Sequence, residues 1–101
     1  MTYYFCRIIL PRSNFVKTMN DSEKALMKAH GDYLQSLCEL GSVVCHGPVD
    51  DPKGGWGLSI FNADREDNVK SLTDSDPIII ADVGARYEIL PMKQLRMREA
   101  N

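Results

Sequence analysis

The sequence predicts an α+β domain with the element order βαββαβ, in which an antiparallel sheet is covered on one face by helices. Three observations support this prediction. Segments rich in aromatic and β-branched residues occur near both ends of the chain and in its middle. One long segment has apolar residues at helical spacing, with start and stop signals at its ends. A stretch rich in Asp, Pro and Gly separates two strand-like segments, as in a hairpin.

The first strand is predicted over residues 3–10, where aromatic and β-branched side chains are dense. It ends at Pro11, because proline lacks the N–H that a sheet ladder needs. Residues 11–20 are then expected to form a connecting loop.

The long segment over residues 22–40 is predicted to be a helix. Asn20 and Glu23 have the spacing of a capping box, and Gly41 suits the left-handed position after a helix. Three- and four-residue steps place one set of residues on its inner face: Leu26, His30, Tyr33, Leu34, Leu37 and Leu40.

A β-hairpin is predicted after this helix. Its first strand covers residues 42–47 and ends at Pro48, and its turn covers residues 49–55. In its second strand, residues 56–61, Trp56, Leu58 and Ile60 share one face because successive side chains alternate.

The last part of the chain supplies a second helix and a fourth strand. Asp64 is expected to cap a helix that extends to about Thr73, and the Asp76-Pro77 step ends it. Residues 86–91 form the last strand, and residues 92–101 are a polar, peripheral tail of the single domain 1–101.

This order favours a ferredoxin-like sandwich with one sheet face left bare. The bare face would carry either Phe5 and Ile9 or the alternate set Tyr4, Ile8 and Leu10, together with Trp56 or Phe61. Exposed apolar surface of this extent is unusual on a monomer, so a twofold homodimer through the sheet faces is expected.

Composition limits the partners and the compartment. The 101 residues are 44% hydrophobic and carry a formal net charge of −2. This charge offers no excess of positive residues to bind nucleic acid or an anionic membrane. No leader or membrane-spanning segment is evident, and a cytoplasmic protein is expected.

Cys6, Cys38 and Cys45 lack metal-ligand spacing and are expected to be buried, reduced thiols. Cys45 and His46 should point to opposite faces of a strand, so no metal is expected.

Several motifs together resemble the YCII-related (YciI-like) domain family over nearly the whole chain. They are Leu10-Pro11-Arg12, Gly47-Pro48-Val49, Gly55-Trp56-Gly57-Leu58, Asp76-Pro77 and Tyr87-Glu88-Ile89-Leu90-Pro91-Met92. The resemblance implies a dimeric α/β-barrel fold, which agrees with the element order above. Most members of the family lack an assigned reaction, and some are associated with removing chloride from hydroxylated breakdown products of aromatic rings.

The resemblance also implies a His/Asp pair of His30 and Asp76 that transfers protons without a cofactor. Imidazole is suited to this task because its pKa lies near neutrality, and a nearby carboxylate would fix its tautomer. Arg12 matches the Pro-Arg of the family and could hold an anionic group of a substrate. Tyr33 and Trp56 are further candidates for contacts with a small-molecule ligand.

Each of these residues also has a structural interpretation. His30 could be a satisfied core residue, Asp76 a turn residue and Arg12 a solvated loop charge, while Tyr33 and Trp56 could be packing residues. Two hypotheses therefore remain open: a cofactor-independent isomerase or lyase acting on a small polar or aromatic metabolite, and a non-catalytic dimeric module that binds a ligand or partner. A cofactor-free oxygenase is a third, supported by fold analogy alone.

Overall fold

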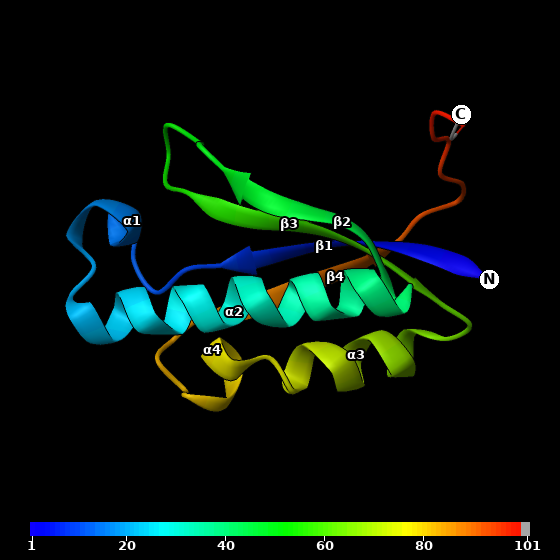
Figure 1. Cartoon of the computed structure of the whole chain (residues 1–101). Helices are drawn as coiled ribbons and strands as arrows, with labels where there is room; N and C mark the ends of the chain where they lie inside the picture. Colours follow the sequence, from blue (N-terminus) through cyan, green and yellow to red (C-terminus); the bar gives the residue numbers. More distant parts are fainter. Residues whose placement is uncertain (100–101) are drawn as a thin grey trace.

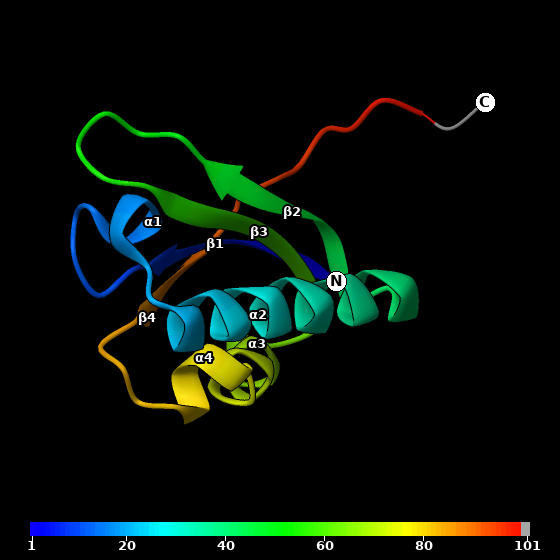
Figure 2. The same cartoon turned by 60° about the vertical axis from the view of Figure 1, so that its left-hand side comes forward.

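Four antiparallel strands form one sheet with the order β2-β3-β1-β4 in the computed structural model, which describes residues 1–99. Helices cover one face of this sheet and leave the other without a layer (Figures 1 and 2). The elements are β1 (Thr2–Ile9), α1 (Phe15–Thr18), α2 (Asp21–Leu40), β2 (Val43–Val49), β3 (Trp56–Ala63), α3 (Glu66–Asp74), α4 (Pro77–Ile80) and β4 (Arg86–Pro91). The predicted ferredoxin-like arrangement is confirmed.

Helix α2 has the two caps that the sequence predicts and begins at Asp21, one residue before the predicted start. The side chain of Asn20 accepts from Glu23 N, and the Glu23 side chain accepts from Asn20 N, so the capping box is complete. Gly41 has φ 90° and ends the helix in the left-handed region. The inner face buries His30, Leu34 and Leu37. The prediction for Leu40 is wrong, because this last residue of the helix is 78% exposed.

The alternation of β1 decides which side chains face the helices. Tyr4, Cys6 and Ile8 are buried beneath the helices, and Phe5 and Ile9 lie on the open face. The register pairs Ile9 with Trp56, so Trp56 also belongs to the open face. Of the two alternatives that the sequence left open, the structure selects Phe5 and Ile9.

Two clusters of buried side chains form the core between sheet and helices. The first cluster consists of Tyr4, Cys6, Leu34, Leu37, Val43, Phe61, Ala63 and Val69. The second consists of Ile8, Leu10, Phe15 and Ile78. The second cluster joins the short helices α1 and α4 to β1, and Met27 of α2 packs against it.

The first connection is not a plain loop, contrary to the prediction. Helix α1 interrupts it because Phe15 is 1% exposed and anchors this turn in the second core cluster. The guanidinium of Arg12 forms a bidentate ion pair with Glu23, at 2.7 and 2.9 Å, and also bonds Thr18. These contacts fix the connection against the start of α2.

The hairpin is confirmed, but its first strand is longer than predicted. Strand β2 continues through Pro48 to Val49. A proline is tolerated there because β2 is an edge strand, so one side of it has no ladder to lose.

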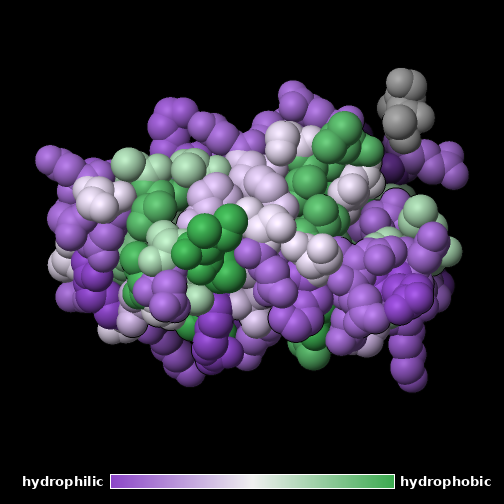
Figure 3. Space-filling view, turned by 90° about the horizontal axis from the view of Figure 1, so that it is seen from below, coloured by the Kyte–Doolittle hydropathy of each residue, from purple (hydrophilic) through white to green (hydrophobic). Residues whose placement is uncertain are grey.

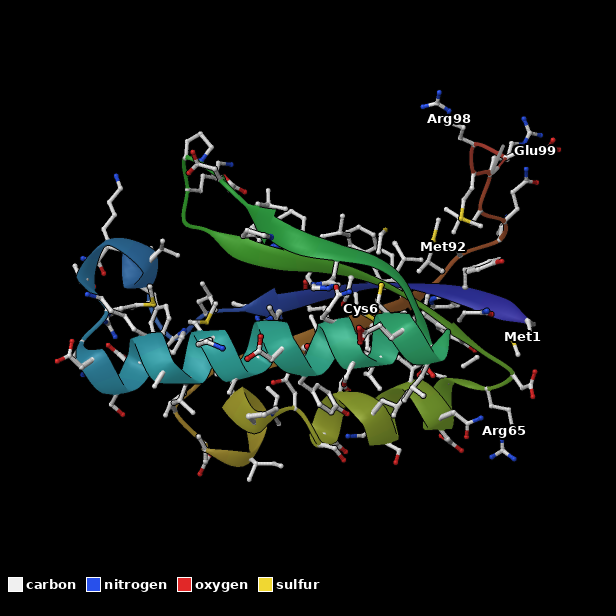
Figure 4. The ribbon with its side chains drawn as sticks, in the orientation of Figure 1. Met1, Cys6, Arg65, Met92, Arg98 and Glu99 are labelled. Atoms are coloured by element: carbon white, nitrogen blue, oxygen red, sulfur yellow. The ribbon has the colours of Figure 1, made fainter. Side chains whose placement is uncertain are left out.

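The second predicted helix also differs in its ends. Asp64 does not cap it: α3 begins after Arg65, whose side chain makes no capping bond and points away from the protein in Figure 4. Asp76-Pro77 begins a new helix rather than only ending the previous one. The Asp76 side chain accepts from Ile78 N and caps α4, with Pro77 in the first turn.

The three cysteines are free thiols in different surroundings. Cys6, labelled in Figure 4, is fully buried, and burial raises its pKa to about 12. Cys38 is half-buried and Cys45 is exposed, so the prediction of a buried thiol is wrong for Cys45. Cys45 is exposed because it lies on the open face of an edge strand.

The surface on the helix side is mainly hydrophilic, with separate hydrophobic patches (Figure 3). No helix within residues 1–99 has the length and apolar character needed to span a bilayer. Residues 92–99 of the predicted tail form neither helix nor strand, and residues 100–101 lie outside the described part of the chain.

The Arg12–Glu23 ion pair should make the free energy of unfolding depend on pH. Hydrogen bonding to Arg12 lowers the pKa of Glu23 from 4.5 to about 2, so folding favours the ionised carboxylate. This contribution is complete above pH 4.5 and is lost as the pH falls toward 2. Glu23→Gln should therefore be less stable than the native protein at neutral pH, and the difference should shrink in acid. Urea unfolding at several pH values measures it, with exposed Glu39→Gln as the control. A difference independent of pH would contradict the expectation.

Candidate active site

His30 and Asp76 meet beneath the helices, as the resemblance implied. His30 Nδ1 lies 2.6 Å from Asp76 Oδ2, and the two side chains are 9% and 0% exposed. Helix α2 supplies His30 from its inner face, and the turn before α4 supplies Asp76. Two residues separated by 46 positions in the sequence thus form a buried pair.

Asp76 has two further hydrogen-bond donors, which fix its carboxylate. Tyr87 Oη donates to Oδ2 at 2.7 Å, and Ile78 N donates to Oδ1 at 3.1 Å. In the sequence analysis, Tyr87 was noted only as part of a family motif, and this role was missed. The available signal was the alternation of β4, because Tyr87 pairs with buried Ile8 and must face the helices.

The hydrogen bonds among His30, Asp76 and Tyr87 determine which nitrogen of His30 can accept a proton. Burial, and then the negative charge of Asp76, raise the pKa of Tyr87 far above its ordinary value, so this hydroxyl stays protonated and donates. An ionised Asp76 can only accept, so His30 Nδ1 carries the proton of their hydrogen bond. The Nε2 lone pair of neutral His30 is then left free to accept a proton.

His30 Nε2 lies at a cavity between α2 and the β2–β3 hairpin. The cavity has a volume of about 300 Å³. Its lining is Leu10, Val16, Met27, His30, Gly31, Leu34, His46, Gly47, Pro48, Val49, Gly55, Trp56, Gly57 and Leu58. Most of these residues offer apolar side chains or backbone, so the imidazole of His30 faces an apolar space.

The structure brings together only part of the predicted site. His30 and Trp56 line the cavity, and Asp76 lies behind His30. Arg12 does not line it, and its guanidinium is already bonded to Glu23 and Thr18. Tyr33 also lies outside the lining.

The two aromatic candidates have hydrogen-bond partners within the protein. Tyr33 Oη donates to Leu72 O at 2.6 Å. Trp56 Nε1 donates to Asp51 Oδ2 at 3.1 Å, and the Trp56 ring lies under the Arg7 guanidinium at 4.3 Å. The hydroxyl of Tyr33 and the indole N–H of Trp56 are therefore already bonded within the protein.

A second cavity of about 490 Å³ adjoins the first. Both are lined by Val16, Pro48, Val49 and Gly55, so the space continues outward between α1 and the hairpin turn. Lys17, Asp50 and Lys53 are among its lining residues, which makes this outer space more polar.

Gly57 leaves room for the side chains of Ile8, on the neighbouring strand β1, and of His30, on α2. A β-carbon at this position would lie 2.6 Å from Ile8 Cγ2 and 3.8 Å from His30 Nε2. Gly57→Ala should therefore lower the free energy of unfolding by about 1–3 kcal/mol through overpacking. Chemical denaturation measures the loss, and Gly47→Ala is the control because a β-carbon there meets nothing within 4 Å. Equal stability of the two variants would contradict this explanation.

Tyr87→Phe should destabilise the protein by about 1.5–3 kcal/mol, because it removes a hydrogen bond to a buried charged group. Thermal and urea unfolding measure the effect. Tyr3→Phe is the control: Tyr3 lies on the open face, and its hydroxyl has no hydrogen-bond partner within the described chain. A loss no greater than that of Tyr3→Phe would show that the Tyr87 bond contributes little.

The neighbouring Cys45 and His46 diverge as the strand alternation predicts. Cys45 is exposed on the open face, whereas His46 points to the helix side and donates from Nε2 to Gln35 Oε1 at 3.0 Å. Within residues 1–99, no three His, Cys, Asp or Glu side chains lie close enough to hold a metal ion.

The fold and the site define a class of small α+β protein in which a buried histidine–carboxylate pair adjoins an apolar cavity. The chain belongs to the YCII-related domain family, whose family model matches residues 1–93. No curated protein matches the chain. The resemblance noted in the sequence is thus confirmed at the level of the family.

Proposed function

We propose that this protein is a cofactor-independent enzyme that transfers protons within a small polar or aromatic metabolite, as an isomerase or lyase. The observation that carries the proposal is the orientation of His30. Its Nδ1 is bonded to buried Asp76, and its Nε2 lies at the cavity. A base that a buried carboxylate holds in one tautomer beside a cavity large enough for a small molecule is the arrangement that general-base catalysis requires.

His30 would act first as base and then as acid. Nε2 takes a proton from a hydroxyl or from a carbon next to a carbonyl, and the electron pair of the broken bond remains on the substrate. The resulting imidazolium is stabilised by the Asp76 carboxylate at 2.6 Å. Return of the proton to another carbon gives an isomer, and loss of a leaving group such as chloride gives elimination.

Isomerisation of a simple unsaturated ketone in D2O tests this proposal. The native protein should accelerate the conversion of 3-cyclohexen-1-one to its conjugated isomer in D2O, with deuterium incorporation followed by NMR. His30→Gln should abolish the acceleration, and Asp76→Asn should lower it because an amide cannot stabilise the imidazolium in the same way. Rates that are equal for native protein and His30→Gln would contradict the proposal. Binding of the ketone without any acceleration would favour the non-catalytic ligand-binding module.

The proposal includes a homodimer through the open sheet faces. Phe5 and Trp56 pack edge to face there, at 6.3 Å between ring centroids, and Leu90 is 57% exposed. A second copy related by a twofold axis would cover this patch with itself. Leu90→Glu should weaken the association, and sedimentation equilibrium measures it. A native chain that stays monomeric at high concentration would contradict the dimer.

A further inference from the structure

Few side chains in the lining of the cavity between α2 and the β2–β3 hairpin can donate a hydrogen bond. Of the lining residues, all of which lie within residues 1–99, only His30, His46 and Trp56 have a side-chain N–H or O–H group. Trp56 Nε1 donates to Asp51, and His30 Nδ1 donates to Asp76. While His30 is neutral, His46 is therefore the side chain in the lining that can offer a donor to a bound molecule.

His46 and His30 belong to different walls of this cavity. His30 projects from α2, whereas His46 belongs to the edge strand β2. His46 Nε2 lies 3.0 Å from Oε1 of Gln35, which follows His30 on α2. Both histidines line one cavity of about 300 Å³, so a small molecule that fills this cavity contacts both residues.

The bond to Gln35 leaves Nδ1 as the nitrogen of His46 that is available to a ligand. An amide oxygen can only accept, so His46 Nε2 carries the proton of this bond. Nδ1 has no hydrogen-bond partner within the described residues. When the ring is protonated, Nδ1 carries a proton as well and can donate to an oxygen in the cavity. His46 is half-buried, so its ring can take up this proton from solvent.

The proposed reaction needs such a donor. Removal of a proton from a carbon next to a carbonyl places negative charge on the carbonyl oxygen, and this charge is costly in an apolar space unless a hydrogen bond receives it. Within residues 1–99, neither a lysine nor an arginine lines the cavity. A protonated imidazole supplies a charge-assisted hydrogen bond, which is stronger than a bond from a neutral group.

We propose that His46 is a second catalytic residue, which donates from Nδ1 to the oxygen of a carbonyl substrate that has hydrogen on the adjacent carbon. His30 Nε2 takes that hydrogen as a proton, the C–H electron pair forms a C=C bond, and the carbonyl π pair moves onto the oxygen. His46 keeps its proton and stabilises the oxygen until His30 returns a proton to another carbon and the C=O bond forms again. This inference rests on the proposed function and narrows its substrate to a carbonyl compound.

Turnover of 3-cyclohexen-1-one by three variants tests the role of His46. His46→Leu has no donor, His46→Asn retains an uncharged N–H on an atom attached to Cγ, as Nδ1 is, and Cys45→Ala is the matched control. Cys45 adjoins His46 in the chain and lies on the opposite face. We expect His46→Leu to lower kcat by about 10²-fold with little change in KM, and His46→Asn to recover part of this loss. Cys45→Ala should retain the native kcat. A His46→Leu protein that is folded by circular dichroism and has the native kcat would overturn the inference.

Cyclohexanone labelled with 13C at its carbonyl tests the same hydrogen bond without turnover. A hydrogen bond to the oxygen moves the carbonyl 13C resonance downfield. We expect the resonance of the bound ketone to lie further downfield in native protein and Cys45→Ala than in His46→Leu. Equal resonances in native protein and His46→Leu would also overturn the inference. His30→Gln separates the two failures: if this variant retains the native rate, the proposed base is contradicted, whereas the carbonyl resonance still reports on His46 alone.

Discussion

Asp76→Ala should lower the free energy of unfolding by about 3–5 kcal/mol, the largest stability effect that we expect from a single side chain. Asp76 is fully buried and accepts hydrogen bonds from His30 Nδ1, Tyr87 Oη and Ile78 N. Alanine would leave these three donors without their acceptor and would remove the cap of α4. Since small domains are stable by about 5–15 kcal/mol in total, the loss would be visible in any unfolding experiment.

Two further variants distinguish the loss of the hydrogen bonds to Asp76 from the loss of a negative charge in general. Asp76→Asn retains one carbonyl oxygen that can accept from Ile78 N, so its loss should be smaller than that of Asp76→Ala. Asp74→Ala removes an exposed carboxylate that pairs with Lys70, and it should change stability by less than about 1 kcal/mol. Urea unfolding of the three variants gives the comparison. Similar losses for Asp74→Ala and Asp76→Ala would contradict the structural role assigned to Asp76.

His30→Gln should have the largest effect on activity, a loss of about 10²–10⁴-fold in the rate of proton transfer. The amide of glutamine can still donate a hydrogen bond toward Asp76, so the buried carboxylate keeps a partner. It has no nitrogen with a basic lone pair to present to the cavity. Deuterium incorporation into the ketone probe measures the rate, and circular dichroism confirms that the variant is folded.

Lys28→Gln is the matched control for His30→Gln. Lys28 lies on the same helix, but its side chain is exposed and pairs with Asp32 away from the cavity. This variant should retain the native rate. A folded His30→Gln protein with the rate of Lys28→Gln would show that His30 is structural, and the ligand-binding module would then be the better account.

The fold could be predicted from the sequence wherever a periodic pattern extended over several turns or a full strand. The capping box at Asn20 and the glycine at Gly41 marked both ends of α2. The short helices were missed because four residues hold too little periodicity, and their positions depend on packing of Phe15 and Ile78 in the core. The cap predicted at Asp64 was wrong: α3 begins after Arg65, and no side-chain bond caps it, so the local pattern of a capping residue was misleading here.

The candidate site could be predicted only in part. The apolar helical face identified His30 as unusual, and the family resemblance supplied Asp76, but no local pattern joins two residues so far apart in the chain. Tyr87 and the shared cavity position of His46 depend on sheet register, which a single sequence does not define. Arg12 matched a family motif, yet a strong ionic partner lies eleven residues away, and spacing alone could not show which partner it takes.

The central claim is that Asp76 holds His30 in the tautomer that leaves Nε2 free at the cavity. The measurement that tests it most directly is the 15N chemical shifts of the His30 ring in the native protein and in Asp76→Asn. We expect native His30, once neutral, to carry its proton on Nδ1, and Asp76→Asn to allow the proton to move to Nε2, since an amide N–H can donate to Nδ1. A native His30 with its proton on Nε2, or a tautomer unchanged by Asp76→Asn, would contradict the claim.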